Sequence, residues 1–100
     1  MEKETMKTRT SQNVFRDLGF GPEEAENLRI RAALMVELTE HIRRAGLTQK
    51  EAAVTLGVTQ PRISDLMRGR ISVFSIDTLI AMLSRVGVKT TIRVGKRKVA

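Results

Sequence analysis

The 100-residue chain lacks cysteine, tryptophan and tyrosine, and its only aromatic residues are three phenylalanines. The absence of cysteine excludes disulfides and cysteine-based metal or redox chemistry. So few aromatic residues argue against a β-sandwich and favour a small helical domain built on aliphatic side chains. No apolar run is long enough to cross a membrane, and residues 1–13 contain no apolar signal core. We therefore expect a cytoplasmic protein without membrane contact.

Residues suited to catalysis are equally scarce. His41 is the only histidine, and it stands among arginines and acidic residues, which favours a role in surface or helix-end packing. The sequence shows no nucleophile–base pair, no cluster of metal ligands and no phosphate-binding glycine loop. We therefore predict that the protein is not an enzyme and uses no cofactor or metal.

Positive charge is what the chain has in excess. Its 18 lysines and arginines against 11 acidic residues give a formal net charge of +7. Such a surplus attracts polyanions, nucleic acid before anionic membranes. Many small basic domains bind nothing acidic, so charge alone does not decide the partner. One hundred residues suffice for one small domain.

The chain divides into three predicted parts. Residues 1–21 form a flexible or partner-binding segment, in which the apolar cluster of "NVFRDLGFG" is equally consistent with a lid on the domain and with a surface for another protein. Residues 22–87 form the helical domain. Residues 88–100 form a C-terminal strand and a basic tail, "GKRK", which either contacts phosphates or is a solvated end.

A long helix is predicted from Pro22 to Ala45. Proline fits a first turn, acidic residues follow it, and Gly46 suits the left-handed conformation that ends a helix. Hydrophobic residues at helical spacing predict a buried stripe made by Leu28, Ala32, Met35, Leu38 and Ile42.

Two short helices follow, joined by a turn at Gly57. Thr48 and Glu51 have the spacing of a capping box at the start of the first helix. Thr59 is a second N-cap, so Pro61 falls in the first turn of the next helix, where proline removes no intrahelical hydrogen bond. Pro61 therefore begins a helix, which runs to about residue 68 and ends at Gly69.

The last helix has Ser75 as its N-cap and Gly87 as its end. Its predicted inward residues are Leu79, Ile80, Leu83 and Val86. The period then changes from helix to strand: apolar positions alternate with polar ones from residue 88 to 94. A lone strand is not stable, and the chain contains no other clear strand.

The spacing within residues 48–69 gives each small or apolar residue a steric role. Ala53 lies where the second short helix crosses the first, and Gly57 supplies the positive φ of a sharp turn. Val58, Ile63 and Leu66 anchor the second helix to the core. This is the helix-turn-helix arrangement, whose second helix enters the DNA major groove.

With these residues in register, the stretch "LTQKEAAVTLGVTQPRISDLMRG" resembles the Xre or lambda-repressor-like helix-turn-helix family. The resemblance covers roughly residues 22–87. It implies a mainly all-α fold, a lambda-repressor-like helix-turn-helix bundle of four to five helices, with a C-terminal β-strand that pairs across a dimer.

The resemblance also implies roles for individual side chains. Gln49 contacts a backbone phosphate and braces the recognition helix, while Gln60 and Arg62 face base edges, which glutamine and arginine read at adenine and guanine. Pro61 departs from the polar residue usual at its position, which leaves base readout there open. The full predicted DNA-binding set is Thr48, Gln49, Thr59, Gln60, Pro61, Arg62, Ser64, Asp65, Arg68 and Arg70.

The end of the chain is similar to HigA-type antitoxins and their orphan relatives, in which a final strand pairs with its copy. The resemblance implies a homodimer on a palindromic operator and possibly a RelE-like toxin as a partner, contacted by residues 1–21. The predicted dimerisation residues are Val88, Thr90, Ile92 and Val94. The alternative is a strand that folds back on its own domain or frays.

We therefore predict a dimeric, sequence-specific repressor that binds double-stranded DNA, the antitoxin of a type II toxin-antitoxin operon that represses its own promoter. Two alternatives stay open: a stand-alone Xre-type regulator with no toxin, and an adaptor whose helix-turn-helix docks a protein. The sequence gives neither the operator nor the regulated genes.

Overall fold

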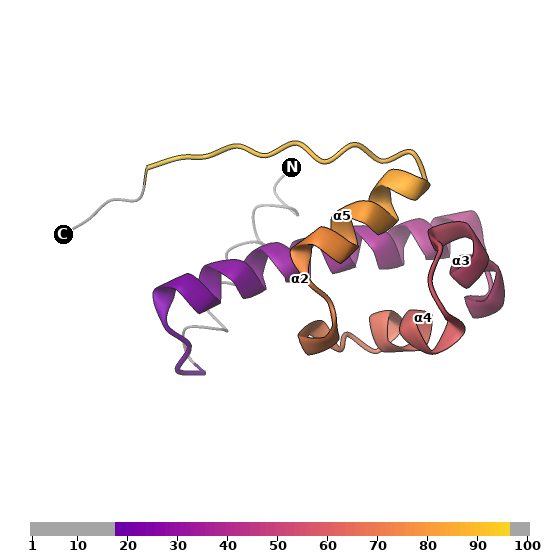
Figure 1. Ribbon diagram of the computed structural model, residues 1–100, viewed down its shortest axis with the longest axis horizontal. Coiled ribbons are helices and arrows are strands. Elements are labelled where there is room, and N and C mark those ends of the chain that lie inside the picture. The colour runs from indigo at the N-terminus through magenta and orange to yellow at the C-terminus, as the bar shows by residue number, and fades with distance from the viewer. Residues whose placement is uncertain (1–17, 97–100) are drawn as a thin grey trace.

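The computed structural model describes residues 18–96, and this part of the chain forms four α-helices and one short 3₁₀ helix. In chain order these are α2 (Pro22–Ala45), α3 (Gln49–Leu56), α4 (Gln60–Met67), the 3₁₀ helix η1 (Ile71–Val73) and α5 (Ile76–Arg85). Helix α2 runs through the length of the domain, with α5 along one side of it, α4 on the other side and α3 near its C-terminal end (Figure 1). The mainly helical prediction is confirmed.

The ends of α2 follow from local sequence. Pro22 lies in the first turn, next to Glu23 and Glu24, whose negative charge is favourable at the positive end of the helix dipole. Gly46 ends the helix in the left-handed conformation, with φ of 67°. The predicted boundaries are therefore confirmed.

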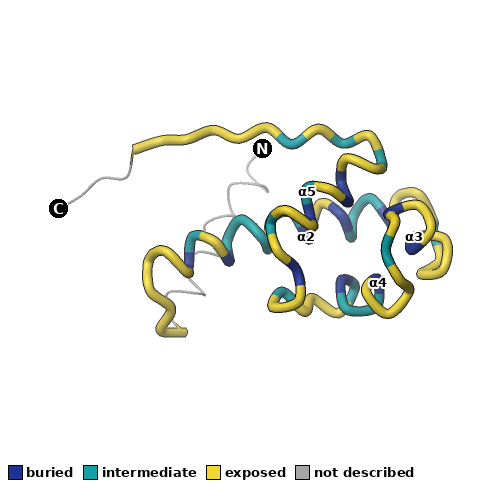
Figure 2. The backbone as a smooth tube through the Cα atoms, viewed as in Figure 1, coloured by how far each residue is buried: buried dark blue, intermediate teal, exposed yellow. Residues whose placement is uncertain are grey.

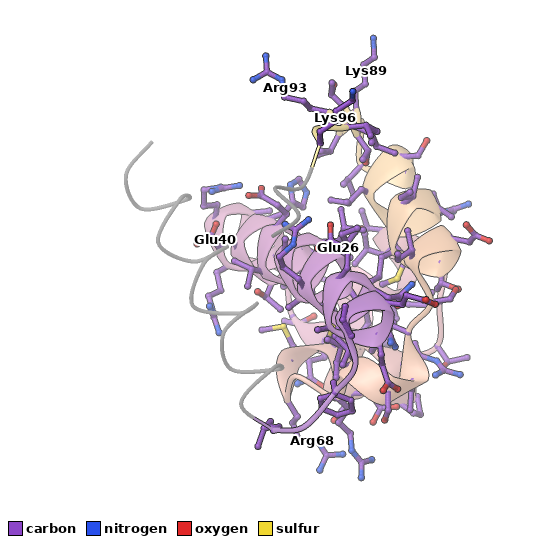
Figure 3. The ribbon with its side chains drawn as sticks, turned by 90° about the vertical axis from the view of Figure 1, so that its left-hand side faces the viewer. Glu26, Glu40, Arg68, Lys89, Arg93 and Lys96 are labelled. Carbon is purple, nitrogen blue, oxygen red and sulfur yellow. The ribbon has the colours of Figure 1, made fainter. Side chains whose placement is uncertain are left out.

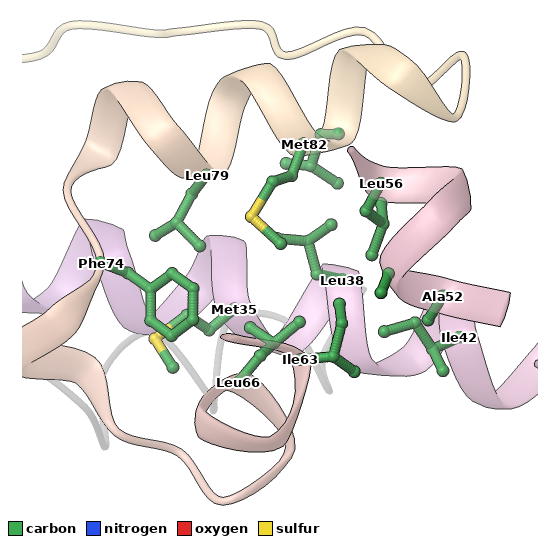
Figure 4. Packing of buried hydrophobic residues seen from close by; sticks show 12 residues of the cluster. Met35, Leu38, Ile42, Ala52, Leu56, Ile63, Leu66, Phe74, Leu79 and Met82 are labelled. Carbon is green, nitrogen blue, oxygen red and sulfur yellow. The ribbon is translucent and has the colours of Figure 1, made fainter. Parts of the chain in front are cut away.

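The core lies where α2 meets the other helices. Leu38 of α2, Ile63 of α4 and Met82 of α5 converge there, and each is almost fully buried (Figure 4). Burying an aliphatic side chain of this size stabilises a domain by about 1.5–3 kcal/mol. The whole buried cluster consists of Met35, Leu38, Ile42, Ala52, Ala53, Leu56, Ile63, Leu66, Phe74, Leu79, Met82 and Leu83.

Several predicted core positions differ from the observed burial. In α2, Ala32 is only half-buried, whereas Ala25, which was not predicted, is buried. In and after α5, Ile80 and Val86 are half-buried, and Met82 is buried instead. Helical periodicity gives the middle of an apolar face but not its edges, because the edges depend on where the neighbouring helix crosses (Figure 2).

The turn between α3 and α4 is made at Gly57, which has a φ of 71°. The backbone N–H of Gly57 donates to Val54 O, and that of Val58 donates to Ala53 O, which satisfies the carbonyls at the end of α3. The side chain of Arg85 from α5 lies against the α-carbon of Gly57. The turn therefore needs glycine for its positive φ, whereas the exposed, flexible side chain of Arg85 can move aside.

The strand predicted for residues 88–94 is absent from the single chain, and no strand occurs between residues 18 and 96. Val88 donates its N–H to Leu83 O at the end of α5, and the chain then runs extended past α5 (Figure 1). A strand needs a neighbouring edge with unpaired N–H and C=O groups, and the described neighbours are helices that use theirs internally. Pairing with a second copy stays a prediction.

The predicted segment at residues 1–21 lies mostly outside the described residues, as do Arg97 and Lys98 of the basic tail. Of the apolar cluster in "NVFRDLGFG", Leu18 and Phe20 are described, and they are 69% and 37% exposed. Within the described part of the chain, no helix combines the length and apolar character needed to span a bilayer.

We expect Gly57→Ala and Gly46→Ala to destabilise the domain by similar amounts. Both glycines have positive φ, so alanine at either position costs about 1–2 kcal/mol in backbone strain. At residue 57 the added Cβ also lies 2.5 Å from Arg85 Nε, but that side chain is exposed and flexible and can move aside, and at residue 46 the Cβ meets open space. Urea denaturation of the two variants measures the difference.

Combining Gly57→Ala with Arg85→Ala should recover little of the lost stability, because the strain lies in the backbone. A much larger loss of unfolding free energy in Gly57→Ala than in Gly46→Ala would contradict this account of the turn.

Candidate nucleic-acid interface

Helices α3 and α4 bury apolar residues in the core and leave most of their polar residues exposed. Ala53 of α3 is almost fully buried at the crossing, and Ile63 and Leu66 of α4 are buried in the core. The opposite face of α4 carries the predicted DNA-binding residues. Gln60, Pro61, Arg62 and Arg68 are exposed on it, and Ser64 and Asp65 are half-buried at its border.

The first turn of α4 is built as the sequence predicts. Thr59 is the N-cap, and its hydroxyl accepts the backbone N–H of Arg62 at 3.4 Å. Pro61 lies in this first turn, where its missing N–H has no intrahelical acceptor to lose. The side chain of Gln60 makes no hydrogen bond to another described residue, so its amide is available to a ligand.

The start of α3 is held by a reciprocal pair of hydrogen bonds. Thr48 accepts the N–H of Glu51 at 3.1 Å, and Glu51 Oε1 accepts the N–H of Thr48 at 2.9 Å. This confirms the predicted capping box and leaves Gln49 in the first turn, exposed and without a side-chain hydrogen bond to the rest of residues 18–96. The hydroxyl oxygen of Thr48 already accepts a hydrogen bond from the helix backbone.

Arg62 does not project freely from the recognition face. Its Nη1 donates to the backbone oxygen of Val73 at 3.1 Å, and its guanidinium carbon lies 5.8 Å from the centre of the Phe74 ring. Both partners belong to the segment after α4. The predicted contact of Arg62 with guanine therefore competes with contacts that Arg62 already makes.

The far end of α4 is a cluster of one acid and two bases. Asp65 Oδ1 lies 3.4 Å from Arg70 Nη1 and 3.9 Å from Arg68 Nη2. Arg68 and Arg70 remain exposed, which suits contacts to phosphates. Asp65 pairs with these arginines, and this pairing reduces its availability to a cytosine amino group.

Arg31 of α2 was not predicted as a site residue. Its Nη1 donates to two backbone oxygens, of Ile71 at 3.1 Å and of Phe74 at 3.3 Å, while its Nε donates to Asn27 at 2.7 Å. It therefore fixes η1 from the side opposite to Arg62. No local sequence signal indicates such a role, because the acceptors are backbone groups 40 or more residues away.

The described residues offer little for catalysis or metal binding. No group of three or more histidine, cysteine or acidic side chains comes together among them. An open pocket of about 340 Å³ lies between α2 and the end of α4, and Arg43 is the one titratable residue among those that line it. Its other lining residues are Ala32, Met35, Val36, Thr39, Leu66, Met67, Gly69 and Ile71.

Basic side chains lie on two opposite sides of the domain. Arg68 is on the side of α4, and Lys89, Arg93 and Lys96 are on the C-terminal segment, beyond α5 (Figures 1 and 3). The polar face of α4 therefore stays open when the C-terminal segment is occupied by a partner.

We expect Arg31→Ala to lower the free energy of unfolding by about 1–2 kcal/mol, because two half-buried carbonyls lose their donor. The matched control is Arg29→Ala on the same helix. Arg29 pairs with Glu26 at 2.7 Å, and this hydrogen bond raises the pKa of Arg29, but the pair is partly exposed and contributes about 0.5 kcal/mol.

Urea denaturation gives both values, and hydrogen exchange of the amides of residues 72–75 locates the effect. Faster exchange there in Arg31→Ala alone is the expected result. A larger loss of stability in Arg29→Ala than in Arg31→Ala would show that Arg31 does not fix η1.

Comparison with known protein families agrees with this geometry. A family model described as a helix-turn-helix domain matches residues 14–95, which is most of the chain. No curated protein matches the chain. The matched range contains α3, the turn at Gly57 and α4, and its family is typically non-enzymatic. The chain belongs to the helix-turn-helix domain family, which indicates a DNA-binding regulator.

Proposed function

We propose that the chain is a dimeric, sequence-specific repressor of transcription that binds a palindromic operator in double-stranded DNA. We further propose that it is the antitoxin of a type II toxin-antitoxin operon and represses its own promoter in the cytoplasm. One observation carries the DNA contact: the first turn of α4 presents Gln60, exposed and without a hydrogen-bond partner among residues 18–96, at the helix end that enters a groove.

The charges around this turn suit a duplex. Arg68 and Arg70 are exposed beside α4, and the first turn of α3 brings Gln49 and Lys50 to the same helix pair. Arginine and lysine here position the protein on phosphates, while Gln60 pairs with adenine through its amide. The net charge of +7 adds a long-range attraction to DNA.

The proposal of a dimer is based on the C-terminal segment, residues 88–96. Among residues 89–96 no backbone group hydrogen-bonds to another described backbone group, and Ile92 and Val94 are 73% and 89% exposed. The hydroxyl of Thr90 is buried without a hydrogen-bond partner. An antiparallel copy of the same segment supplies partners for the backbone and cover for the apolar side chains.

The proposal of a toxin partner is based on the sequence resemblance alone. We propose that residues 1–21 contact the toxin. The stand-alone regulator without a toxin uses the same DNA-binding face and dimer. The neighbouring reading frame distinguishes the two proposals. A short basic protein encoded there, in the same operon, would favour the antitoxin.

We expect Gln60→Ala to reduce discrimination between operator and random duplex by about 1–3 kcal/mol, the contribution of one bidentate base contact. Gln49→Ala is the matched control: it removes a phosphate contact, so it weakens binding to both duplexes equally. Fluorescence anisotropy, on an operator obtained by selection from random duplexes, measures the affinities of the wild type and the two variants for both duplexes.

Titration with salt accompanies these measurements. Affinity for duplex should fall steeply as salt rises, because phosphate contacts release counterions. Unchanged discrimination in Gln60→Ala would remove α4 from base recognition, and the absence of any duplex binding would favour the adaptor that docks a protein.

For the dimer, we expect Ile92→Asp combined with Val94→Asp to give a monomer in sedimentation velocity. Both side chains are exposed in the single chain, so the charges leave the fold intact but cannot be covered by a partner. Val54→Asp is the control, because Val54 of α3 is 77% exposed and lies outside the segment. A dimer that survives the double substitution would place the interface elsewhere.

A further inference from the structure

The segment after α4 is fixed from two sides. Arg31 of α2 donates to the backbone oxygens of Ile71 and Phe74, and Arg62 of α4 donates to that of Val73. The Phe74 side chain is buried in the core and anchors the end of the segment. These contacts leave η1 with a defined place beside α4 instead of the freedom usual for a surface loop.

Arg62 takes part in this arrangement through its position in α4. It belongs to the first turn, one residue after Pro61, and its side chain reaches back to residues 73 and 74. The guanidinium combines a hydrogen bond to the backbone of Val73 with a contact over the Phe74 ring. It therefore joins the first turn of the recognition helix to η1.

The segment after α4 also exposes an apolar side chain. Val73 remains 41% exposed although its backbone is held by Arg62. Pro61, in the first turn of α4, is exposed and has neither a donor nor an acceptor in its side chain. In the major groove the base edge that suits such side chains is the C5-methyl group of thymine.

We propose that Arg62 is a positioning residue and that Val73 determines specificity by contacting a thymine methyl group. Arg62 holds η1 against the first turn of α4, and Val73 thereby becomes part of the base-reading surface. This inference rests on the proposed binding of double-stranded DNA. It assigns to Arg62 a role different from the guanine contact that the sequence resemblance implies.

The experiment uses the full chain and the best duplex selected on it from a random pool. Each thymine is replaced singly by deoxyuridine, which lacks the methyl group, and each guanine by 7-deazaguanine, which lacks the N7 acceptor. Affinities are measured for the wild type, Val73→Ala, Arg62→Ala and Arg62→Lys.

One thymine should be sensitive in the wild type, with an affinity about fourfold lower for deoxyuridine, the effect of one buried methyl-sized group. That sensitivity should vanish in Val73→Ala and in Arg62→Ala, and should return in part in Arg62→Lys, which still donates to Val73 O. Sensitivity to 7-deazaguanine should be the same in Arg62→Ala as in the wild type.

Two results would overturn the proposal. A guanine whose 7-deaza sensitivity disappears in Arg62→Ala would show that Arg62 reads a base directly. Deoxyuridine effects that are unchanged in Val73→Ala would show that Val73 makes no methyl contact. A selection that yields no preferred duplex would contradict the proposed sequence-specific binding. This outcome differs from the two above, which contradict only the roles of Arg62 and Val73.

Discussion

The burial of one apolar face of α2 is the constraint on which the rest of the domain depends. Helices α3 and α4 have eight residues each, which is too short for stability in isolation. They persist because Leu56, Ile63 and Leu66 pack against α2 around Leu38. Since that contact uses the apolar face of α4, the opposite face is left polar and exposed. The proposed DNA-binding surface is therefore a consequence of the core.

Some polar side chains on the exposed face of α4 already have partners within the domain. Asp65 is paired with two arginines, and Arg62 is bound to the backbone and ring of the following segment. Gln60 has no hydrogen-bond partner within residues 18–96 at the N-terminal end of α4. A surface of this kind separates two tasks. In the proposed function, arginines at its edge attract and position phosphates, while a few neutral side chains near the first turn distinguish bases.

The C-terminal segment shows the opposite situation, since the backbone of residues 89–96 has no hydrogen-bond partner in the described backbone. Val88 still packs against the core, whereas Ile92 and Val94 are exposed beyond it. An alternating sequence predicts a strand correctly only where an edge is present to receive it. The helices of the described domain offer no such edge, so the segment is extended without forming a strand.

The sequence by itself determined the helices and their limits, because caps, left-handed glycines and a first-turn proline act over a few neighbouring residues. Thr48, Gly57, Thr59 and Pro61 all have the predicted local roles. Only the tertiary structure decided where Arg31 and Arg62 bind, because their acceptors are backbone oxygens or a ring from distant parts of the chain. Backbone acceptors carry no residue identity, so no sequence pattern records such contacts. The same holds for the edges of the core, which were set by how α5 crosses α2.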